Sequence, residues 1–525
     1  MSIEKKVKKS SIFTLMIFTL GSRVLGLVRE MVKAKYLGSA ILNDAFNAAF
    51  TIPNLLRRLF AESSMTVAFI PTFKGYLKND NKKETKDFIN ATFTALTFIV
   101  TITVVLGIIF TPIIVKVFKA QNTDIPELIL LTRVMFPYLA FISLAALCQG
   151  VLNSLNIFGP GGFVPILFNI ITIIITILFT KLKVTANPAR AMAIGITLGG
   201  VSQMAFQLPY ILKNGFGFKL TSLKKAFNNK GTKKVGRLIT PTLASMGAYQ
   251  LSTAVAQMLA LNTGVGISSA LGYSLRLQEL VLGIFAVSIG TILISTLSRD
   301  AKDKNWGNFT SSLQLSVNVI AFLTIPITVF AYIHSTEIVT LVYKSGAFGE
   351  KGVLMTSQVF RIHISGLYFI ALSRVIAPAF FSLEDSKTPA ILGVISVVFG
   401  IILMFTLAPI FKGQGIAVAT ILSSTLLTIL YFIFLGKKED INFKSIMKSS
   451  IPAFIRITIF SLLAAIPLLR YKDRIFNILN TGNRIIDFGI PLIITTLLYF
   501  SVYVIILIIT KENVLKELKR LARRP

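Results

Sequence analysis

Stretches of predominantly apolar residues, each long enough to cross a lipid bilayer, recur along the whole chain and constrain its fold more than any other feature. A membrane-spanning helix needs about 20 such residues. Short polar breaks separate fourteen of these stretches, at 11–37, 43–73, 88–118, 128–154, 163–181, 188–212, 238–262, 266–298, 308–333, 354–382, 389–411, 413–435, 450–469 and 486–510. The composition, 54% hydrophobic and 14% charged, agrees with an all-α integral membrane protein.

Lysine and arginine are unevenly divided between the segments that connect these stretches. If the N-terminus is cytoplasmic, the connecting segments on that side carry 31 of the 54 basic residues, whereas those on the opposite side, in which we count Lys33, carry 13. The positive-inside rule therefore predicts that both termini are cytoplasmic. The same asymmetry explains much of the net charge of +32 without a nucleic-acid partner, and anionic membrane lipids are the expected contact.

Ten basic residues fall within or at the ends of the apolar stretches, and all ten are arginine. They are Arg23, Arg29, Arg57, Arg58, Arg133, Arg190, Arg276, Arg361, Arg374 and Arg456. The acids in similar places are Glu30, Asp44, Glu62 and Glu279. An ionisable group within a bilayer usually faces the protein interior or a water-filled cavity, and the planar fork of arginine suits phosphate or carboxylate. Snorkelling to the membrane surface is the alternative that we favour for Arg133, Arg190 and Arg456.

The densest polar group lies in the first two stretches. SRVLGLVRE places Arg23 and Arg29 about 120° apart on an unbroken helix. In PNLLRRLFAE, Arg58 and Glu62 are four residues apart, a spacing that also suits a structural ion pair. Arg57 has no such partner downstream, so we expect it to bind an anion.

A second polar centre lies in GYSLRLQELVLGIF. Arg276 and Glu279 are at positions i and i+3, where they either neutralise each other or leave Arg276 to serve the same anion site. Asp44, near the start of the second stretch, either caps that helix or has a functional role.

An internal similarity suggests two related halves. The sequence from Arg133 aligns without gaps with the sequence from Arg361, 228 residues later. Chance similarity between apolar helices is the alternative, whereas a true repeat predicts two lobes of six helices in parallel orientation. The predicted organisation is an N-lobe at 1–212, a basic cytoplasmic linker at 213–237, a C-lobe at 238–436, two further spans at 437–510 and a basic cytoplasmic tail at 511–525.

Motifs for enzyme chemistry are absent from the sequence. The chain has one cysteine and two histidines, no HExxH, no phosphate-binding glycine loop and no aqueous segment large enough for a catalytic domain. We therefore predict a transporter rather than an enzyme, with no metal and no cofactor. Arginines inside two helical lobes indicate transport of a large anion by alternating access.

Four segments closely resemble the MurJ (MviN) family of lipid II flippases, which belongs to the multidrug/oligosaccharidyl-lipid/polysaccharide exporter superfamily. They are SRVLGLVREM (22–31), NDAFNAAFTIPNLLRRLFAESSMTVAFIPTF (43–73), RLQELVLGIFAVSIGTILIS (276–295) and DSKTP (385–389). The resemblance runs over nearly the whole chain. It implies fourteen helices, with two six-helix lobes forming a V around a cationic cavity and two C-terminal helices providing a groove for a lipid tail.

The resemblance also implies the cargo and the residues that handle it. The cargo is lipid II, an undecaprenyl-pyrophosphate-linked disaccharide-pentapeptide, which is moved from the inner to the outer leaflet of the bacterial plasma (inner) membrane for peptidoglycan synthesis. Other proteins of cell-wall synthesis are candidate partners. The substrate-binding residues are Arg23, Arg29, Arg57 and Arg276; the gate or cavity-mouth residues are Ser22, Asp44 and Glu62; and the supporting residues are Arg58, Glu279 and Arg374.

One departure from the family concerns sodium. Some relatives are thought to bind it through acidic and amide side chains of spans 7 and 11, but here span 7 has no acid and span 11 has neither group. We therefore expect the membrane potential, rather than sodium at that site, to drive transport. The alternatives are a flippase for another polyprenyl-pyrophosphate-linked glycan, a MATE-like exporter, or a scaffold for cell-wall enzymes.

Overall fold

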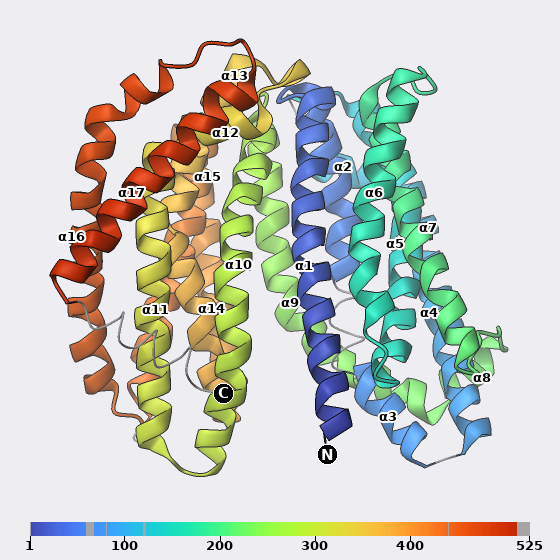
Figure 1. Ribbon diagram of the computed structural model, residues 1–525. Helices are drawn as coiled ribbons and strands as arrows, with labels where there is room; N and C mark the ends of the chain where they lie inside the picture. Colours follow the sequence, from blue (N-terminus) through green and yellow to red (C-terminus); the bar gives the residue numbers. More distant parts are fainter. Residues whose placement is uncertain (1, 59–67, 80, 119–121, 439, 512–525) are drawn as a thin grey trace. The chain divides into compact units, whose positions relative to one another are not determined.

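Helices make up every regular element that the computed structural model describes, within residues 2–58, 68–79, 81–118, 122–438 and 440–511 (Figure 1). The elements are α1 (Ser2–Leu37), α2 (Ile41–Arg57), α3 (Ile70–Lys78), α4 (Lys82–Val117), α5 (Ile125–Ser154), α6 (Gly159–Lys181), α7 (Pro188–Lys213), α8 (Leu223–Asn228), α9 (Lys230–Thr263), α10 (Ile267–Lys302), α11 (Trp306–Ile333), α12 (Ser335–Tyr343), η3 (Gly346–Phe348), α13 (Gly349–Ser365), α14 (Leu367–Ser382), α15 (Lys387–Leu435), α16 (Phe443–Phe476), η4 (Ile485–Gly489) and α17 (Ile490–Ile509).

Many of these helices are suited to a lipid bilayer. By length and composition, eight described helices can cross it: α4, α5, α6, α7, α11, α15, α16 and η4 continued by α17. Residues Gly346–Ser365 and Leu367–Ser382, which are η3 with α13 and then α14, meet at a bend of 44° and form either a ninth span that is broken or a re-entrant loop. The prediction of an all-α chain with several membrane-crossing helices is therefore confirmed.

The long helix α15 contains two of the predicted spans. Its 49 residues would extend for about 70 Å, more than twice the thickness of the hydrocarbon core of a bilayer. Lys412, with φ 51° and ψ −130°, interrupts the helix at the position between the predicted spans 389–411 and 413–435. The sequence placed this break correctly.

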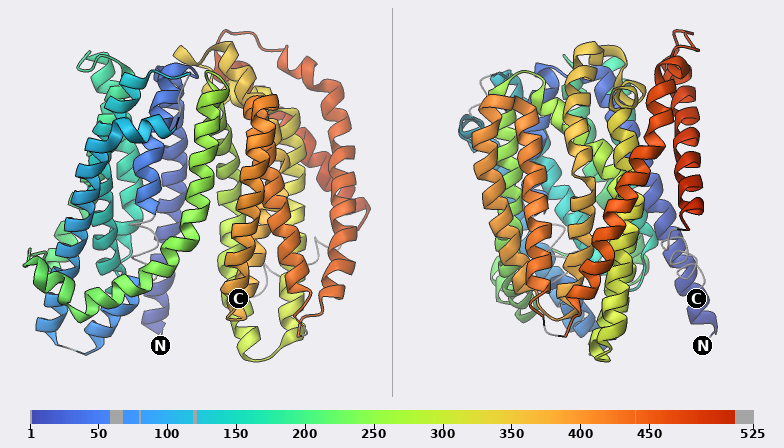
Figure 2. Two further views of the ribbon diagram at one scale, coloured as in Figure 1. Left: turned by 180° about the vertical axis from the view of Figure 1, so that it is seen from behind. Right: turned by 90° about the vertical axis from the view of Figure 1, so that its left-hand side faces the viewer.

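The two arms of α15 fold back on each other, and Figure 2 shows them side by side in orange. The hydroxyl of Ser423 donates a hydrogen bond of 2.6 Å to the carbonyl oxygen of Ser396 on the opposite arm. Near the break, a methyl group on Gly415 would overlap the carbonyl oxygen of Leu407. Only glycine permits such a close approach of the two backbones.

The contacts divide the chain into two compact units, Met1–Ser268 with Ser345–Phe348, and Ser269–Lys344 with Gly349–Pro525. We call them unit 1 and unit 2. By these contacts α9 belongs to unit 1, whereas the sequence pattern begins the C-lobe at residue 238. The lobe boundaries stay a prediction.

In unit 1, α7 packs closely against α5 and α6 because small residues lie at the contact. A side chain on Gly199 would lie 2.7 Å from the ring of Phe168, and one on Gly200 would lie 2.7 Å from the ring of Tyr138. Since lipid is as apolar as the side chains themselves, membrane helices associate largely through such close packing. The result is that polar residues of α5 and α7 can meet inside the unit.

An ion pair also joins the beginnings of α5 and α7. The Nε and Nη2 atoms of Arg190 lie 3.1 and 2.7 Å from the Oε2 atom of Glu127, whose Oε1 atom accepts a hydrogen bond of 3.0 Å from Asn187. The guanidinium of Arg190 therefore connects two helices at their beginnings. Its snorkelling to the membrane surface stays a prediction.

The internal similarity has a counterpart in the backbone. Non-glycine residues rarely adopt positive φ, yet Asn156 (φ 62°) and Glu384 (φ 59°) both do so, and they are 228 residues apart. Asn156 lies between α5 and α6, and Glu384 lies between α14 and α15. The same turn thus occurs at equivalent positions of the aligned segments, which supports a true repeat.

A short segment of the second half of the chain belongs to unit 1. Residues Ser345–Phe348 pack against the turn between α1 and α2, where the hydroxyl of Ser39 donates a hydrogen bond of 3.3 Å to the carbonyl of Phe348. Gly38 (φ 71°) faces the backbone of Ala347, and Gly346 (φ 55°) faces the carbonyl of Lys35. We call this reciprocal contact of Gly38 and Gly346 the glycine clasp.

Candidate functional site

Helix α1 carries several ionisable side chains in one continuous helix. Arg23 and Arg29 are both partly buried. The guanidinium of Arg29 lies 5.4 Å from the centre of the Phe168 ring and 2.9 Å from the Oε1 atom of Glu30. Arg29 is therefore oriented by an aromatic face and by a carboxylate.

Glu30 is also paired with a lysine that the sequence analysis misplaced. Lys33, counted there with the outer connecting segments, lies within α1 and is 6% exposed. Its ammonium is 2.6 Å from the Oε2 atom of Glu30 and 3.2 Å from the Oδ1 atom of Asn47. The embedded cations are therefore not all arginine. The location of Lys33 was missed because an apolar stretch in the sequence does not show how far its helix continues into the protein interior.

Arg57 lies at the C-terminal end of α2. Its Nε atom donates a hydrogen bond of 2.9 Å to the side chain of Asn54, one turn earlier. The neighbouring guanidinium of Arg58 lies 5.9 Å from the centre of the Tyr249 ring. The two arginines therefore have different surroundings, as adjacent positions on a helix predict. Glu62, the expected partner of Arg58, lies outside the described residues.

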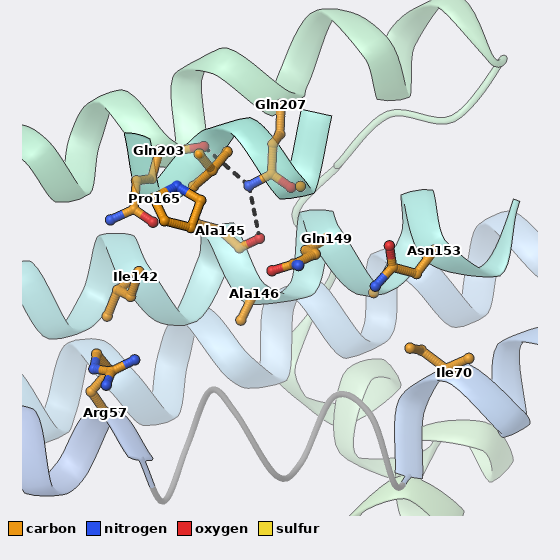
Figure 3. A pocket seen from close by; sticks show the side chains of 13 residues that line it. Arg57, Ile70, Ile142, Ala145, Ala146, Gln149, Asn153, Pro165, Gln203 and Gln207 are labelled. Carbon is orange, nitrogen blue, oxygen red and sulfur yellow. Dashed lines mark hydrogen bonds between the residues drawn. The ribbon is translucent and has the colours of Figure 1, made fainter. Parts of the chain in front are cut away.

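A polar cavity of about 320 Å³ opens beside Arg57 within unit 1 (Figure 3). It is lined by residues of α2, α3, α5, α6 and α7: Arg57, Ile70, Ile142, Ala145, Ala146, Gln149, Gly150, Asn153, Gly161, Val164, Pro165, Gln203 and Gln207. Among the described lining residues, Arg57 carries the only charge. A guanidinium together with neutral amides can bind a ligand that has one anionic end and an adjoining neutral polar part.

The four amide side chains of this cavity were missed by the sequence analysis, although a signal was present. Gln149 and Asn153 are four residues apart on α5, and Gln203 and Gln207 are four residues apart on α7. Residues at this spacing share one face of a helix. Two amide pairs on otherwise apolar helices could therefore have been recognised as a polar lining.

Asp44 is buried and does not cap its own helix. Its Oδ2 atom accepts a hydrogen bond of 2.5 Å from the backbone N–H of Gly266, immediately before α10 begins. The N-cap residue of α2 is Ala40, no side chain caps the helix, and the side-chain amide of Asn43 donates a hydrogen bond to the carbonyl of Gly38. The proposed capping of α2 by Asp44 is therefore wrong. The carboxylate instead lies beside the N-terminus of another helix, where negative charge is favourable.

In unit 2, Arg276 and Glu279 form an ion pair of 3.0 Å on α10, and both side chains are almost half exposed. The structure thus bears out the neutralising pair, and a role of Arg276 at an anion site stays a prediction. Arg374 is exposed on α14. Arg361 instead braces two helices, since it donates hydrogen bonds from α13 to the hydroxyls of Ser335 and Thr336 at the start of α12.

The remaining gate residue, Ser22, is partly buried on α1, and its carbonyl accepts a hydrogen bond of 3.2 Å from Asn169 of α6. Within the described residues, no group of three or more His, Cys, Asp or Glu side chains could hold a metal ion.

Comparison with known proteins assigns the chain to a family. The profile of the family described as "Lipid II flippase MurJ" matches residues 33–477. The chain belongs to the MurJ family. The resemblance seen in its sequence is confirmed, and its apolar helices agree with a MurJ-family protein that crosses the bacterial inner membrane several times.

Individual relatives match this MurJ-family chain over most of its length. The "Probable lipid II flippase MurJ" of Treponema pallidum (strain Nichols) is 37% identical over 505 residues, which cover 95% of each chain. The "Lipid II flippase MurJ" of Burkholderia cenocepacia is 30% identical over 428 residues, which cover 80% of this chain and 82% of that protein.

One solved structure gives the same assignment. "Lipid II flippase MurJ, inward closed conformation" matches with a TM-score of 0.76 and 26% identity, and covers 95% of this chain and 99% of that one. An inward-facing MATE-family transporter of the MOP superfamily matches with a TM-score of 0.64 and 12% identity, over 83% and 96% of the two chains. The second match shows a common fold only.

Proposed function

We propose that this MurJ-family protein is a lipid II flippase, a transporter rather than an enzyme, which moves the lipid-linked precursor from the cytoplasmic to the outer leaflet of the inner membrane. One observation carries the proposal: in a chain of this family, Arg57 stands at a cavity whose other described polar lining is neutral. A pyrophosphate-linked glycan matches this cavity, because its anionic pyrophosphate is joined directly to neutral sugars.

The arginines have different roles in this proposal. The pyrophosphate meets Arg23, Arg29, Arg57 and Arg276, while Ser22, Asp44 and Glu62 form the gate or cavity mouth and Arg58, Glu279 and Arg374 support the site. Charge-assisted hydrogen bonds to phosphate are among the stronger ones in proteins. The pairing of Arg29 with Glu30 reduces the field at that position. Arg57 lines the cavity, so it is the principal anchor in this proposal.

The architecture that we propose has fourteen spans, in two six-helix lobes that form a V around a cationic cavity. The N-lobe is 1–212 and the C-lobe is 238–436, joined by the basic linker 213–237. Spans 13 and 14, within 437–510, provide the groove for the lipid tail, and both termini, including the basic segment 511–525, are cytoplasmic. The break at Lys412 and the matched turns at Asn156 and Glu384 support this arrangement.

The membrane potential is the proposed driving force. Moving one charge across 100 mV is worth about 2.3 kcal/mol. The embedded cations of a carrier that returns empty would experience this field. Sodium coupling through spans 7 and 11 is not part of the proposal, because those spans lack the acids that sodium prefers.

The direct test measures lipid II on the outer face of cells that are depleted of their own flippase and express this protein. The intact chain should restore exposure, and Arg57→Ala at equal membrane level should not, because the loss of charge-assisted bonds weakens cargo binding roughly 10- to 150-fold. Arg57→Lys, which retains the charge but not the fork, should be intermediate. Arg133→Ala is the matched control, since Arg133 is exposed on α5.

The outcomes separate the competing functions. If the inserted intact chain restored no exposure, another polyprenyl-pyrophosphate-linked glycan would become the better cargo. If it exported cationic drugs, the MATE-like alternative suggested by the shared fold would hold. If Arg57→Ala restored exposure fully, Arg57 would have no place on the transport path.

A further inference from the structure

The cavity beside Arg57 has a neutral side whose polar groups are arranged for a ligand. Its amides are Gln149 and Asn153 on α5 and Gln203 and Gln207 on α7, and we call this part of the cavity the amide pocket. Figure 3 shows Arg57 at one side of the cavity, with the labelled amides on the two helices opposite.

Gln207 is a buried amide held in place at the wall of the amide pocket. It is completely buried, and its Nε2 atom donates hydrogen bonds of 3.1 Å to the carbonyl oxygens of both Ala145 and Gln203. These two bonds hold the carboxamide in one orientation. Its Oε1 atom is buried and has no hydrogen-bond partner within the described residues. An acceptor left in this state costs about 1–3 kcal/mol. Gln207 thus forms a fixed wall of the amide pocket, and the amides that a ligand can reach are those of Gln149, which is exposed, and Asn153, which is partly exposed.

Several residues that line the amide pocket have small side chains or none, which leaves room for a ligand. Ala145, Ala146, Gly150 and Gly161 all line it. A methyl group on Gly161 would lie 3.0 Å from the Cγ atom of Gln149, so the absence of a side chain there leaves space for Gln149. Pro165 also has no N–H to donate to the carbonyl of Gly161, one helical turn earlier. The pocket therefore combines space with hydrogen-bond acceptors.

We infer that the amide pocket binds the sugar directly attached to the pyrophosphate of the cargo, while Arg57 binds the phosphate beside it. The inference rests on the proposed function. The occupant is a sugar rather than the peptide because a peptide ends in a carboxylate, for which the described lining offers no cation beyond Arg57. Neutral hydroxyl and acetamido groups match carboxamides, which both donate and accept hydrogen bonds.

The test compares three lipids in equilibrium binding to the purified full-length protein: undecaprenyl pyrophosphate, the same lipid with its disaccharide but no peptide, and complete lipid II. The intact protein should bind the disaccharide lipid more tightly than undecaprenyl pyrophosphate. The double variant Gln149→Leu/Asn153→Leu should lose this preference by roughly 5- to 100-fold, since two neutral hydrogen bonds are removed, and should still bind undecaprenyl pyrophosphate. Arg57→Ala should weaken the binding of all three lipids.

Two further variants guard against a folding artefact. Gly161→Ala retains all four amide side chains but crowds Gln149, so it should also reduce the preference for the disaccharide lipid. Gln358→Leu, which changes an exposed glutamine on α13, should leave all three affinities unchanged.

The inference can fail separately from the proposed function. Equal weakening of all three lipids by the pocket variants, or weakening only when the peptide is present, would overturn the sugar subsite. Unchanged affinities in the pocket variants would do the same while leaving lipid II as the cargo. An intact protein that bound none of the lipids would overturn the proposed function, and the subsite with it.

Discussion

The glycine clasp offers a prediction in which two similar substitutions should have different costs. Gly346 has φ 55°, and a side chain there would overlap the carbonyl oxygen of Lys35 at the end of α1. Gly349, three residues later, has a similar φ of 62°, but a side chain there meets nothing within 4 Å in the described part of the chain. Gly349→Ala is thus a matched control for Gly346→Ala.

The expected magnitudes follow from these two environments. An alanine in the left-handed region costs about 1–2 kcal/mol, and this applies to both variants. Only Gly346→Ala adds the overlap with backbone, which cannot move as a flexible side chain can, and overpacking of this kind costs about 1–3 kcal/mol more. Gly346→Ala should therefore destabilise the clasp by about 2–5 kcal/mol, and Gly349→Ala by about 1–2 kcal/mol.

Limited trypsin digestion of the full-length protein is a suitable assay, because Lys344 and Lys351 flank the segment. Cleavage of a folded protein reports local opening. Gly346→Ala should release the segment and accelerate cleavage at these lysines by roughly 10-fold or more over Gly349→Ala, since about 1.4 kcal/mol corresponds to a factor of ten. Cleavage within the linker 213–237, which is far from the clasp in sequence, serves as an internal reference.

Equal cleavage rates in Gly346→Ala and Gly349→Ala would refute the reasoning. Such a result would mean that backbone strain accounts for the whole effect and that the contact with Lys35 contributes nothing. Faster cleavage at the linker as well would point instead to general unfolding.

Two further predictions concern unit 2. Burial alone would raise the pKa of Asp385, but hydrogen bonds from Lys438 and neighbouring groups lower it to about 2. Because this pKa is below its ordinary value, the ionised carboxylate stabilises the folded protein above about pH 4, and this stabilisation is lost as the pH falls toward 2. The thermal unfolding midpoint of the intact protein should fall as the pH is lowered through this range. The midpoint of Asp385→Asn should already be lower at neutral pH and should lack this part of the pH dependence. Gly415→Ala should separate the arms of α15 at Leu407 and lower the midpoint in thermal unfolding, whereas Gly393→Ala, where the described surroundings are open, should leave it unchanged or raise it; equal midpoints would contradict the close approach.

The positions of the membrane-crossing helices were largely predictable from the sequence. The break near residue 412 and the turns that follow α5 and α14 were both visible as polar interruptions between apolar stretches. The reason is that the free energies of transferring side chains from water to lipid are nearly additive along a segment, so they can be summed without knowing which helices pack against it. Arg57 could be selected in the same way, because an arginine in an apolar segment is costly wherever the segment lies.

The partners of the polar residues were decided only by the tertiary structure. The sequence did not reveal that Asp44 accepts a hydrogen bond from Gly266, more than 200 residues away, or that Lys33 is buried against Glu30. Nor did it reveal that the amides of α5 and α7 line one cavity. A hydrogen bond requires two groups within about 3 Å, and that distance is set by how helices pack, which no local pattern contains. The sequence thus determined which segments enter the membrane and which charges they carry, and the packing of α2, α5, α6 and α7 determined the cavity that those charges and amides line.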